Sequence, residues 1–416
     1  MSATSETPSL HLFDAFGVEL EYMLVRRDNL AVLPRTDDLL AAVAGEVVSD
    51  LDMGELSWSN ELVLHVVELK TTAPAPRLEV LADLFQHDVR RINELLEPLG
   101  GRLMPTAMHP WMDPLLETRL WPHDYSPVYQ AYDRIFGCRG HGWSNLQSAH
   151  LNLPFTGDAE FGRLHAGIRL LLPLLPALAA SSPIVEGRGT GLLDNRMEFY
   201  RLNSRRIPEV CAEVIPEPAF SEGEYQRQIL QPLYRAIEPF DPEGVLRFEF
   251  LNSRGAIARF DRGSIEIRVI DVQECPQADL AVVAASVGVL QALAAERWSS
   301  LADQQAMPAE PLAKLLRRVI RDADAAPIDD PAYLGLFGLD AATATAGELW
   351  QHLHAELLRG VSTPPPWART LERMIEHGPL ARRLLRVLGN EPEHRRLMEV
   401  YGQLCDCLEG GELFVG

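Results

Sequence analysis

Four short stretches, far apart in the chain, alternate between apolar and polar residues, and this pattern restricts the fold more than any other feature. They read GVELEYMLV (17–25), ELVLHVVELKT (61–71), SAHLNL (148–153) and RGSIEIRVID (262–271). Alternation of this kind is typical of a β-strand with one face on a core. The strands do not follow a regular strand–helix rhythm, so we predict an α+β fold with an antiparallel sheet.

The remaining elements change in character near residue 300. Before it we predict strands at 16–25, 61–71, 101–108, 147–154, 245–251 and 264–272, and helices at 76–97, 158–180, 222–238 and 277–297. After it the periodicity predicts only helices, at 309–322, 346–359, 366–388 and 392–409. We therefore expect a catalytic body over residues 1–300 and a helical C-terminal portion over residues 301–416 packed on it. The long apolar run within 158–180 is interrupted by Pro173 and Pro176, which favours a buried, kinked helix over a membrane span.

Polar residues of an unusual kind share one face of each stretch, because residues two apart on a strand point to the same side. A solvated strand face commonly mixes Lys, Thr, Gln and Glu, whereas these faces carry carboxylates, an imidazole and a guanidinium. Oxygen-rich sets of this type suit Mg²⁺ or Mn²⁺. The residues are Glu19 and Glu21, then Glu68, then Ser148, His150 and Asn152, and finally Ser264, Glu266 and Arg268. We interpret the shared face as a metal site, with an ordinary solvated sheet face as the alternative.

Glu61 opens the second stretch, but it stands seven residues before Glu68. A regular strand would point these two side chains to opposite faces. Both can face one site only if Glu61 precedes the regular strand or a bulge intervenes. On that condition Glu61 is also a candidate metal ligand.

Arginines gather in two regions of a chain that is otherwise strongly acidic. Arg247, Arg254, Arg259, Arg262 and Arg268 lie between residues 247 and 268, and Arg196, Arg201, Arg205 and Arg206 lie between residues 196 and 206. The guanidinium fork matches phosphate and carboxylate oxygens, so acids for a metal beside arginines for an anion indicate phosphoryl transfer from a nucleotide. The alternative is that these arginines pair with Asp194, Glu198, Glu249 or Asp261 to hold loops.

Net charge and cysteine content limit the other classes of function. The formal net charge is −21, from 59 acidic and 38 basic residues, which argues against a nucleic-acid or anionic-membrane binder. The five cysteines are odd in number and none has zinc-finger spacing, and Cys405 and Cys407 fall on different faces of the last predicted helix. We expect a cytoplasmic protein that acts on small molecules, and the sequence leaves a homo-oligomeric state open.

Taken in this order and spacing, GVELEYMLV, ELVLHVVELKT, SAHLNL and RGSIEIRVID resemble the motifs of the glutamate–cysteine ligase type 2 family, over roughly residues 12–300. That family is similar in fold to glutamine synthetase. The resemblance implies a curved antiparallel sheet that holds Mg²⁺ and ATP, in an enzyme of glutathione biosynthesis. It implies that the side-chain carboxylate of glutamate is phosphorylated by ATP and that an amine, most often that of cysteine, then displaces phosphate.

The resemblance also implies roles for individual residues. It implies metal binding by Glu19, Glu21, Glu61, Glu68, His150 and Glu266. It implies contacts to the nucleotide by His150 and Asn152 and, as weaker candidates, by Arg201, Asn203 and Arg205. It implies contacts to phosphate or to the substrate carboxylate by Arg254, Arg259 and Arg268.

The block from residue 111 to residue 143 is rich in aromatic residues, beyond what the resemblance leads us to expect. We predict that it forms either a lid or acceptor pocket, or simple packing; the candidates are Trp111, His123, Tyr125, His141 and Trp143. Three functions remain in competition: an ATP-dependent ligase of glutamate with cysteine or another amine, a metal-dependent hydrolase of an amide or phosphate ester, and a binding protein without chemistry. The intact acidic set and the many arginines favour the ligase.

Overall fold

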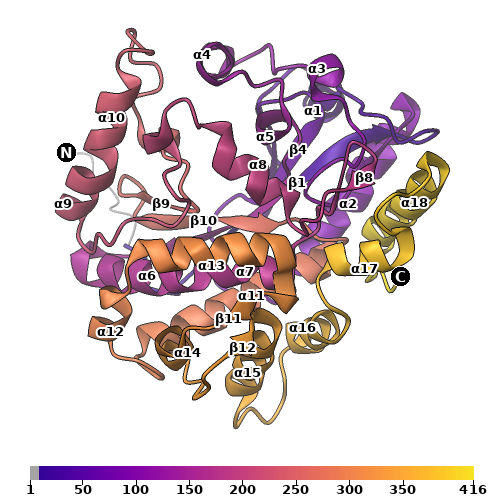
Figure 1. The fold of residues 1–416 in the computed structure, drawn as a ribbon. Coiled ribbons are helices and arrows are strands. Elements are labelled where there is room, and N and C mark those ends of the chain that lie inside the picture. The colour runs from indigo at the N-terminus through magenta and orange to yellow at the C-terminus, as the bar shows by residue number, and fades with distance from the viewer. Residues whose placement is uncertain (1–8) are drawn as a thin grey trace.

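A computed structural model describes residues 9–416 and confirms an α+β fold built on an antiparallel sheet (Figure 1). The sheet has eight strands in the order β2-β3-β4-β1-β6-β10-β9, and β5 also pairs with β1. The strands are β1 (Gly17–Arg26), β2 (Asp50–Asp52), β3 (Leu56–Asn60), β4 (Val66–Thr71), β5 (Gly101–Met104), β6 (Ser148–Pro154), β9 (Ala256–Arg259) and β10 (Ser264–Asp271). Strand β1 is therefore central, with neighbours that come from distant parts of the chain.

One face of the sheet is apolar and is covered by helices. Val18, Leu20 and Tyr22 of β1 are fully buried on this face, and the Tyr22 hydroxyl donates to Asp279 at 3.4 Å. Figure 1 shows several of the covering helices beneath β10. They are α2 (Leu81–Leu96), α6 (Gly157–Leu171), α7 (Leu175–Ala179), α11 (Pro276–Ala294) and α13 (Ala309–Asp322). The predicted division of β1 into an apolar and a polar face is thus confirmed.

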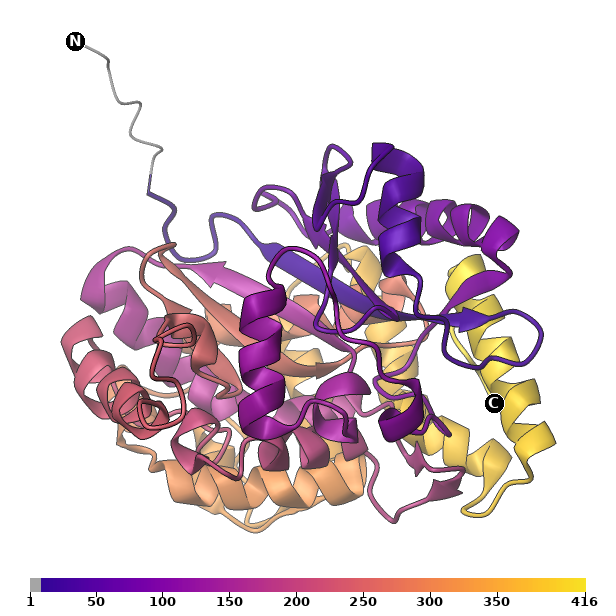
Figure 2. The same cartoon turned by 90° about the horizontal axis from the view of Figure 1, so that it is seen from above.

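The opposite, polar face of the sheet lies toward a second group of helices. This group comprises α4 (Ser126–Phe136), α5 (His141–Ser144), α8 (Asn195–Asn203), α9 (Glu222–Tyr225) and α10 (Gln231–Ile237). Seen from above in Figure 2, α4 stands in front of the strands. Asn60, at the end of β3, donates to the hydroxyl of Tyr129 on α4 at 3.1 Å, so this helix borders the polar face.

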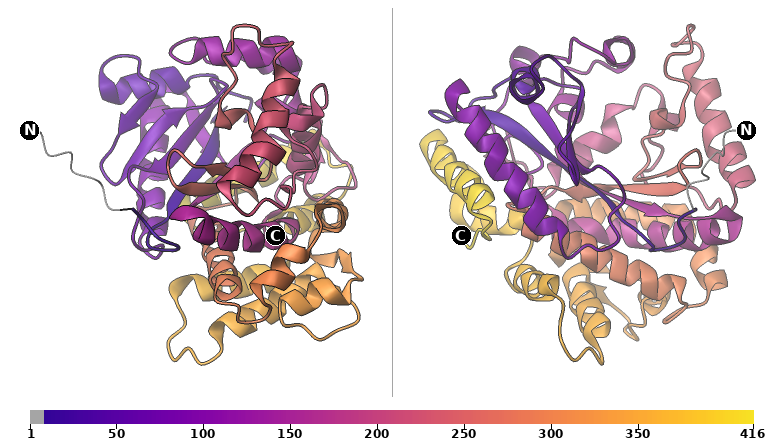
Figure 3. Two further views of the ribbon diagram at one scale, coloured as in Figure 1. Left: turned by 90° about the vertical axis from the view of Figure 1, so that its left-hand side faces the viewer. Right: turned by 180° about the vertical axis from the view of Figure 1, so that it is seen from behind.

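Helices after residue 300 share the main hydrophobic core with the sheet. Leu312, Leu349, Met374 and Leu408 belong to the same buried cluster as the apolar residues of β1. In the right-hand view of Figure 3 the orange helices lie at the bottom, and the yellow C-terminal helix lies at another edge, beside α2. The helices are α12 (Leu301–Ala306), α14 (Pro331–Leu336), α15 (Ala346–Leu358), α16 (Pro366–His377), α17 (Leu380–Leu388) and α18 (His394–Gly410). The division into two parts at residue 300 stays a prediction.

Helix α11 is the one helix within residues 9–416 that is long and apolar enough to cross a membrane by length and composition. It is packed inside the fold, against α2, α6 and α16. Burial on all sides explains why its sequence is apolar nearly all round. The run from 158 to 180 is helical in α6, tightens to a 3₁₀ turn at 172–174 and resumes in α7, so the interruption at Pro173 and Pro176 is confirmed.

Three strand predictions need correction. No strand forms at 245–251, because the carboxylate of Asp241 accepts the backbone N–H groups of Val245 and Leu246 and holds a turn there, followed by a 3₁₀ turn at 249–251. The strand expected at 61–71 begins only at Val66, since residues 62–64 hydrogen-bond with 119–121 instead. The strand expected at 101–108 ends at Met104. Strands β2, β3 and β9 were not predicted.

The C-terminal region differs in two respects. The helix expected at 366–388 is two helices, because Gly378 has a φ of 80° and Pro379 lacks an N–H. Two short strands, β11 (Pro327–Ile328) and β12 (Ala344–Thr345), pair where none was predicted. The remaining elements are α1 (Thr36–Ala44), α3 (Pro114–Glu117), β7 (Ile184–Val185) and β8 (Arg188–Gly189).

Candidate active site

Strand register places the acids of β1 beside polar residues of both neighbouring strands. Glu19 lies opposite Lys70 of β4 and opposite His150 of β6. Glu21 lies opposite Glu68 of β4. Directly opposite residues of an antiparallel pair point to the same face and lie close together. The sheet therefore brings residues 19, 21, 68, 70 and 150 onto one surface.

Strand β10 adds to this surface from the far side of β6. Glu266 lies opposite Asn152, and its Oε1 is 3.9 Å from Nδ1 of His150. Arg268, two residues further on, places its Nε 2.8 Å from the same Oε1. Asn152 donates its side-chain amide to Oε1 of Glu19 at 3.0 Å. All the strand residues singled out for this face thus meet, apart from Ser264, which lies further along β10.

Two groups of side chains within residues 9–416 offer ligand atoms that lie within 4.8 Å of one another. The first is Glu19, His150 and Glu266, and the second is Glu21, Glu68 and His150. His150 belongs to both, so the groups are adjacent. Carboxylate oxygens with one imidazole are donors that Mg²⁺ and Mn²⁺ accept. The residues present therefore fit one or two divalent cations.

His150 is held at both ring nitrogens, by a carboxylate at Nδ1 and by a hydroxyl at Nε2. Its Nδ1 lies 2.8 Å from Oε2 of Glu19, and its Nε2 lies 2.9 Å from the Ser148 hydroxyl, which itself donates to Glu21. Burial would lower the pKa of His150, but the hydrogen bond to Glu19 and the charge of Glu21 raise it to about 9. Burial by itself would raise the pKa of Glu19, but the hydrogen bond to His150 and the charge of His150 lower it to about 2. In the absence of a cation, protonated His150 thus offsets part of the negative charge of Glu19 and Glu21.

At two further acids the protein disfavours the negatively charged form. Burial and the charge of Glu19 raise the pKa of Glu68 to about 7, although Lys70 opposes this from 3.2 Å. Burial and the charges of Glu68 and Glu21 raise the pKa of Glu61 well above its usual value. Glu61 lies between the end of β3 and the start of β4. It therefore precedes the regular strand, which is the first of the two conditions under which it can face the site. Crowded, buried carboxylates of this kind are stabilised by a bound cation.

Ser148 fixes Glu21 in this cluster. Its backbone N–H donates to Oε2 of Glu21 at 2.6 Å and its hydroxyl donates to the same oxygen at 2.9 Å. Glu21 is only 7% exposed, so these two donors replace the water that would otherwise solvate it. The other oxygen, Oε1, remains directed to the His150 side at 3.9 Å. One oxygen of Glu21 is therefore bound by the protein and the other faces the site.

The five other residues expected at the nucleotide or phosphate lie outside the two groups. Arg254 is 3% exposed and makes a bidentate pair with Glu217 at 2.6 Å, together with contacts to the Asn252 side chain and the Glu209 carbonyl. Arg259 lies on β9 opposite Ser264 and pairs with Glu249 at 3.3 Å and Asp261 at 3.5 Å. These two arginines are thus engaged in holding loops, which is the alternative considered for them.

The candidates on α8 are likewise engaged elsewhere. Arg201 forms a bidentate pair with Glu198 at 2.6 Å. Asn203 donates to the Gly142 carbonyl and accepts from the indole of Trp143, which ties α8 to α5. Arg205 follows α8 and is exposed. These three residues do not reach the clustered acids in this conformation.

The aromatic block is divided between packing and the border of the site. Trp111 packs edge-on against His109 and against His394 and Tyr401 of the C-terminal helix. It lies outside both acidic groups. Trp143 stacks on Phe136 at 5.5 Å. The other candidates are placed as follows: His123 lies 3.1 Å from Asp37, Tyr125 is 60% exposed, and His141 contacts Asn145 and Phe199. No member of this candidate set lies in the two acidic groups.

Three tyrosines that were not singled out border the site instead. Tyr129 of α4 accepts from Asn60, and burial together with the charge of Glu61 raises its pKa. Burial raises the pKa of Tyr132 and of Tyr200, and the nearby Arg268 opposes the shift in both. The spacing of Tyr129 and Tyr132, three apart in a helical segment, was the available sequence signal that they share a face. Tyr200, on α8, carried no such signal.

A cavity of about 930 Å³ opens beside the first acidic group. Glu19 and Asn152 line it together with Thr71, Ser264 and the segment 260–263, among other residues. Its size and position allow a ligand of moderate size to reach the candidate metal ligands. A second cavity, of about 540 Å³, lies between α2, α11 and α16 and contains none of the clustered acids.

Comparison with known proteins gives a family match over nearly the whole chain. A model described as glutamate-cysteine ligase family 2 matches residues 15–400. An uncharacterized protein of Archaeoglobus fulgidus is 37% identical over 276 residues, which are 66% of this chain and 74% of that protein. A protein of Rubrobacter xylanophilus, provisionally named glutamate–cysteine ligase 2-3, is 30% identical over 189 residues, about half of each chain (45% and 49%).

Solved structures show the same fold at low sequence identity. A glutamate–cysteine ligase of Francisella tularensis, in complex with AMP, has a TM-score of 0.63 at 13% identity, and the match covers 96% of this chain and 90% of that one. A bifunctional glutathione synthetase of Pasteurella multocida has a TM-score of 0.58 at 14% identity, covering 96% of this chain and 52% of that one. This chain thus spans about half the length of the second protein.

Proposed function

This chain belongs to glutamate-cysteine ligase family 2, and from that premise we propose that it joins the side-chain carboxylate of glutamate to an amine at the expense of ATP. Cysteine is the first candidate for the amine. The observation that carries the proposal is the meeting of two acidic groups at His150, beside Arg268 and open to a large cavity. Acids for divalent cations beside a half-buried guanidinium form a site suited to phosphoryl transfer.

The reaction needs an activation step because a carboxylate is a poor electrophile at neutral pH. A γ-carboxylate oxygen of glutamate attacks the terminal phosphorus of ATP, ADP leaves, and an acyl phosphate forms. The amine then attacks the acyl carbon and inorganic phosphate departs; the amine loses a proton to solvent or to a site carboxylate. Divalent cations, when bound, offset the repulsion between the carboxylate and the triphosphate.

The residues divide this work by position. Glu19 borders the cavity together with Asn152, and Glu19, His150 and Glu266 would hold a cation that also contacts the phosphates. The second group, Glu21 and Glu68, with Glu61 near them, would hold a cation deeper along the polar face. Arg268 lies beside both groups, where its fork could neutralise charge on the transferred phosphoryl group.

The identity of the amine rests on the names of relatives more than on this site. The named relatives are called glutamate–cysteine ligases, and that supports cysteine. Tyr129, Tyr132 and Tyr200 border the polar face near Glu61 and Arg268, where they could contact an acceptor. The five cysteines are all free, which is consistent with the reducing cytoplasm that we propose as its location.

A substrate screen tests the proposal directly. The protein is incubated with Mg²⁺, ATP and glutamate, with one amine at a time drawn from the amino acids and polyamines, and ADP release and the amide product are measured. We expect ADP release that requires both glutamate and the amine, at a rate highest with cysteine. Amide cleavage without nucleotide, or an absence of Mg²⁺·ATP binding in titration calorimetry, would refute the proposal.

A further inference from the structure

Strand β10 contains a bulge at the residue proposed to neutralise phosphate. Ile267 pairs with Leu151 of β6 and Ile270 pairs with Ala149, so Arg268 and Val269 together face the single residue His150. A bulge of this kind interrupts the ladder of backbone hydrogen bonds and re-aims the side chains at that point. It also leaves buried backbone groups that must find other partners.

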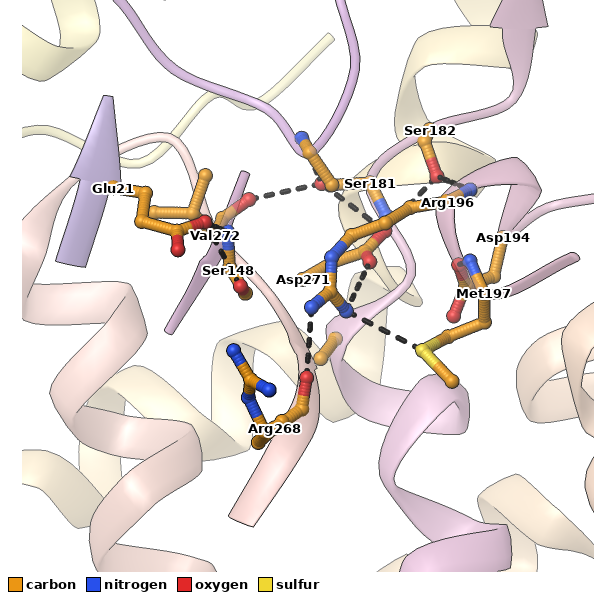
Figure 4. Close-up of polar contacts among 12 residues, drawn as sticks. Glu21, Ser148, Ser181, Ser182, Asp194, Arg196, Met197, Arg268, Asp271 and Val272 are labelled. Carbon is orange, nitrogen blue, oxygen red and sulfur yellow. Dashed lines mark hydrogen bonds and ion pairs between the residues drawn. The ribbon is translucent and has the colours of Figure 1, made fainter. Parts of the chain in front are cut away.

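Arg196 supplies one of these partners. Its Nη2 donates to the carbonyl oxygen of Arg268 at 2.7 Å (Figure 4). The backbone N–H of Arg268 donates to the Gly255 carbonyl at 2.9 Å, on the other side of β10. Both polar backbone groups of Arg268 are therefore paired outside the regular ladder with β6. Arg196 is 72 residues away in sequence and only 2% exposed.

Arg196 is itself held in place by a buried polar network. Its Nη1 lies 3.5 Å from Oδ1 of Asp271, and its backbone N–H donates to the Ser182 hydroxyl at 3.1 Å. Asp271 also accepts from the Ser182 hydroxyl at 3.0 Å and from the Ser181 backbone N–H at 2.9 Å. Figure 4 shows these contacts grouped around Asp271, at the end of β10. Most polar groups of this network are paired, although Nε of Arg196 has no partner, and such pairing favours a fixed geometry.

We propose that Arg196 is a positioning residue, which fixes the backbone of the bulge so that the Arg268 guanidinium lies beside the acidic groups. The inference rests on the proposed role of Arg268. The side chain of Arg268 leaves the bulge and reaches Glu266 at 2.8 Å. Without the donor at its carbonyl, the buried oxygen must find another partner, and the bulge must move to provide one. Arg196 acts through Arg268 and does not contact the cavity.

The experiment compares Arg196→Met and Arg196→Lys with Arg268→Met and with the double variant Arg196→Met/Arg268→Met. Arg169→Met is the matched control, because Arg169 is fully buried and bonds the carbonyls of Pro216 and Met307 away from the site. For each protein we measure the melting temperature, Mg²⁺·ATP affinity by calorimetry, and kcat and KM for ADP release with glutamate and cysteine. A crystal structure of Arg196→Met completes the set.

We expect Arg196→Met to lower kcat at least tenfold with an unchanged KM for ATP, and Arg196→Lys to recover part of the loss. The double variant should be no slower than Arg268→Met, and Arg169→Met should melt earlier but keep the wild-type kcat. An Arg196→Met variant with wild-type kcat, or a double variant slower than Arg268→Met by the full single-variant factor, would overturn the inference.

The crystal structure separates this inference from the proposed function. We expect the contact between Arg268 and Glu266 to be lost in Arg196→Met while the contact between Glu19 and His150 persists. An unchanged Arg268 side chain would overturn the positioning role even in an active enzyme. If the wild-type protein releases no ADP with any amine, the proposed function fails, and the position of Arg268 still decides the structural part of the inference.

Discussion

Ser148 gives two hydrogen bonds to a single oxygen of Glu21, one from its backbone N–H and one from its hydroxyl. The same hydroxyl lies 2.9 Å from Nε2 of His150, so one small side chain links both acidic groups. The contact joins β6 to β1 across 127 residues of sequence. It orients a proposed metal ligand without itself contributing a charge.

Replacement of Ser148 by alanine tests this link. The backbone donor stays and the hydroxyl is lost, so we expect stability to fall by about 1 kcal/mol and Mg²⁺ affinity to fall roughly tenfold. Titration calorimetry with Mg²⁺·ATP measures the affinity. Ser286→Ala is the control, because that buried hydroxyl bonds only the Val282 carbonyl within α11. Equal Mg²⁺ affinity in both variants would show that the hydroxyl does not orient Glu21.

Glu21→Gln separates a metal ligand from a structural acid. We expect turnover to be lost through weaker metal binding, with little loss of stability, because one charge leaves a crowded acidic set. Glu274→Gln is the opposite case, since Glu274 is fully buried and pairs with Arg383 at 2.5 Å. Breaking that pair should cost about 3 kcal/mol and leave kcat per folded molecule unchanged. Chemical unfolding and ADP release distinguish the two, and a large stability loss in Glu21→Gln would make Glu21 structural.

The raised pKa of Glu68 predicts that replacing this residue increases the stability of the metal-free protein at high pH. Burial and Glu19 raise that pKa to about 7, so the folded protein binds this proton more tightly than the unfolded chain does. Stability from this group is present below about pH 4.5 and is lost as the pH rises to 7. Without metal, the stability of Glu68→Gln should therefore exceed that of the wild type by about 3 kcal/mol at pH 8 and match it near pH 4.5.

Mg²⁺ provides the second half of that test. A bound cation compensates the carboxylate charge, so saturating Mg²⁺ should remove or reverse the difference between Glu68→Gln and the wild type. Urea unfolding at pH 4.5 and pH 8, with and without Mg²⁺, measures it. Glu94→Gln, an exposed change on α2, serves as the control. A difference that does not depend on pH would contradict the assignment.

His165 predicts a loss of stability in acid. Burial and the charge of Arg169 lower its pKa to about 3, and its Nδ1 lies 2.7 Å from the Ala219 carbonyl. The unfolded chain then binds this proton near pH 6.5 while the folded protein does not, so stability falls as the pH drops below 6.5. His165→Asn should reduce the loss of stability between pH 7.5 and pH 5 by about 2 kcal/mol. The exposed His87→Asn should leave the pH dependence unchanged, and equal slopes in all three proteins would contradict the prediction.

Gly255 leaves room for the bulge in β10. An added Cβ would lie 2.6 Å from Cγ1 of Val269 and 2.9 Å from Cγ1 of Val214. Gly255→Ala should therefore cost about 2 kcal/mol and lower kcat as well, since the Gly255 carbonyl accepts the N–H of Arg268. Gly402→Ala, where nothing lies within 4 Å on helix α18, should be neutral or slightly stabilising. Unfolding curves and ADP release measure both, and a fully active Gly255→Ala would contradict the link to the bulge.

Some patterns within single elements were read correctly from the sequence, although the strand expected at 245–251 and the single helix expected at 366–388 were not. The period of two in residues 17–25 separates Val18 and Leu20 from Glu19 and Glu21, and backbone geometry enforces that separation in any sheet. The interruption of α6 at Pro173 and Pro176 follows from the missing N–H groups of proline. The kinds of donor on the polar strand faces, carboxylate and imidazole, were likewise visible before any register was known.

Relations between elements were not visible in the sequence. The pairing of residues 62–64 with 119–121 moves Glu61 out of the strand. Arg254 forms an ion pair with Glu217, which lies 37 residues before it in the sequence. A local pattern fixes which face a residue takes, because neighbouring side chains alternate by backbone geometry alone.

Which residues meet across the sheet depends on register, bulges and buried partners drawn from the whole chain. The four stretches by themselves determined a sheet with one polar, acid-rich face. Only the tertiary structure decided that His150 joins two acidic groups and that Arg196 supports Arg268 from behind.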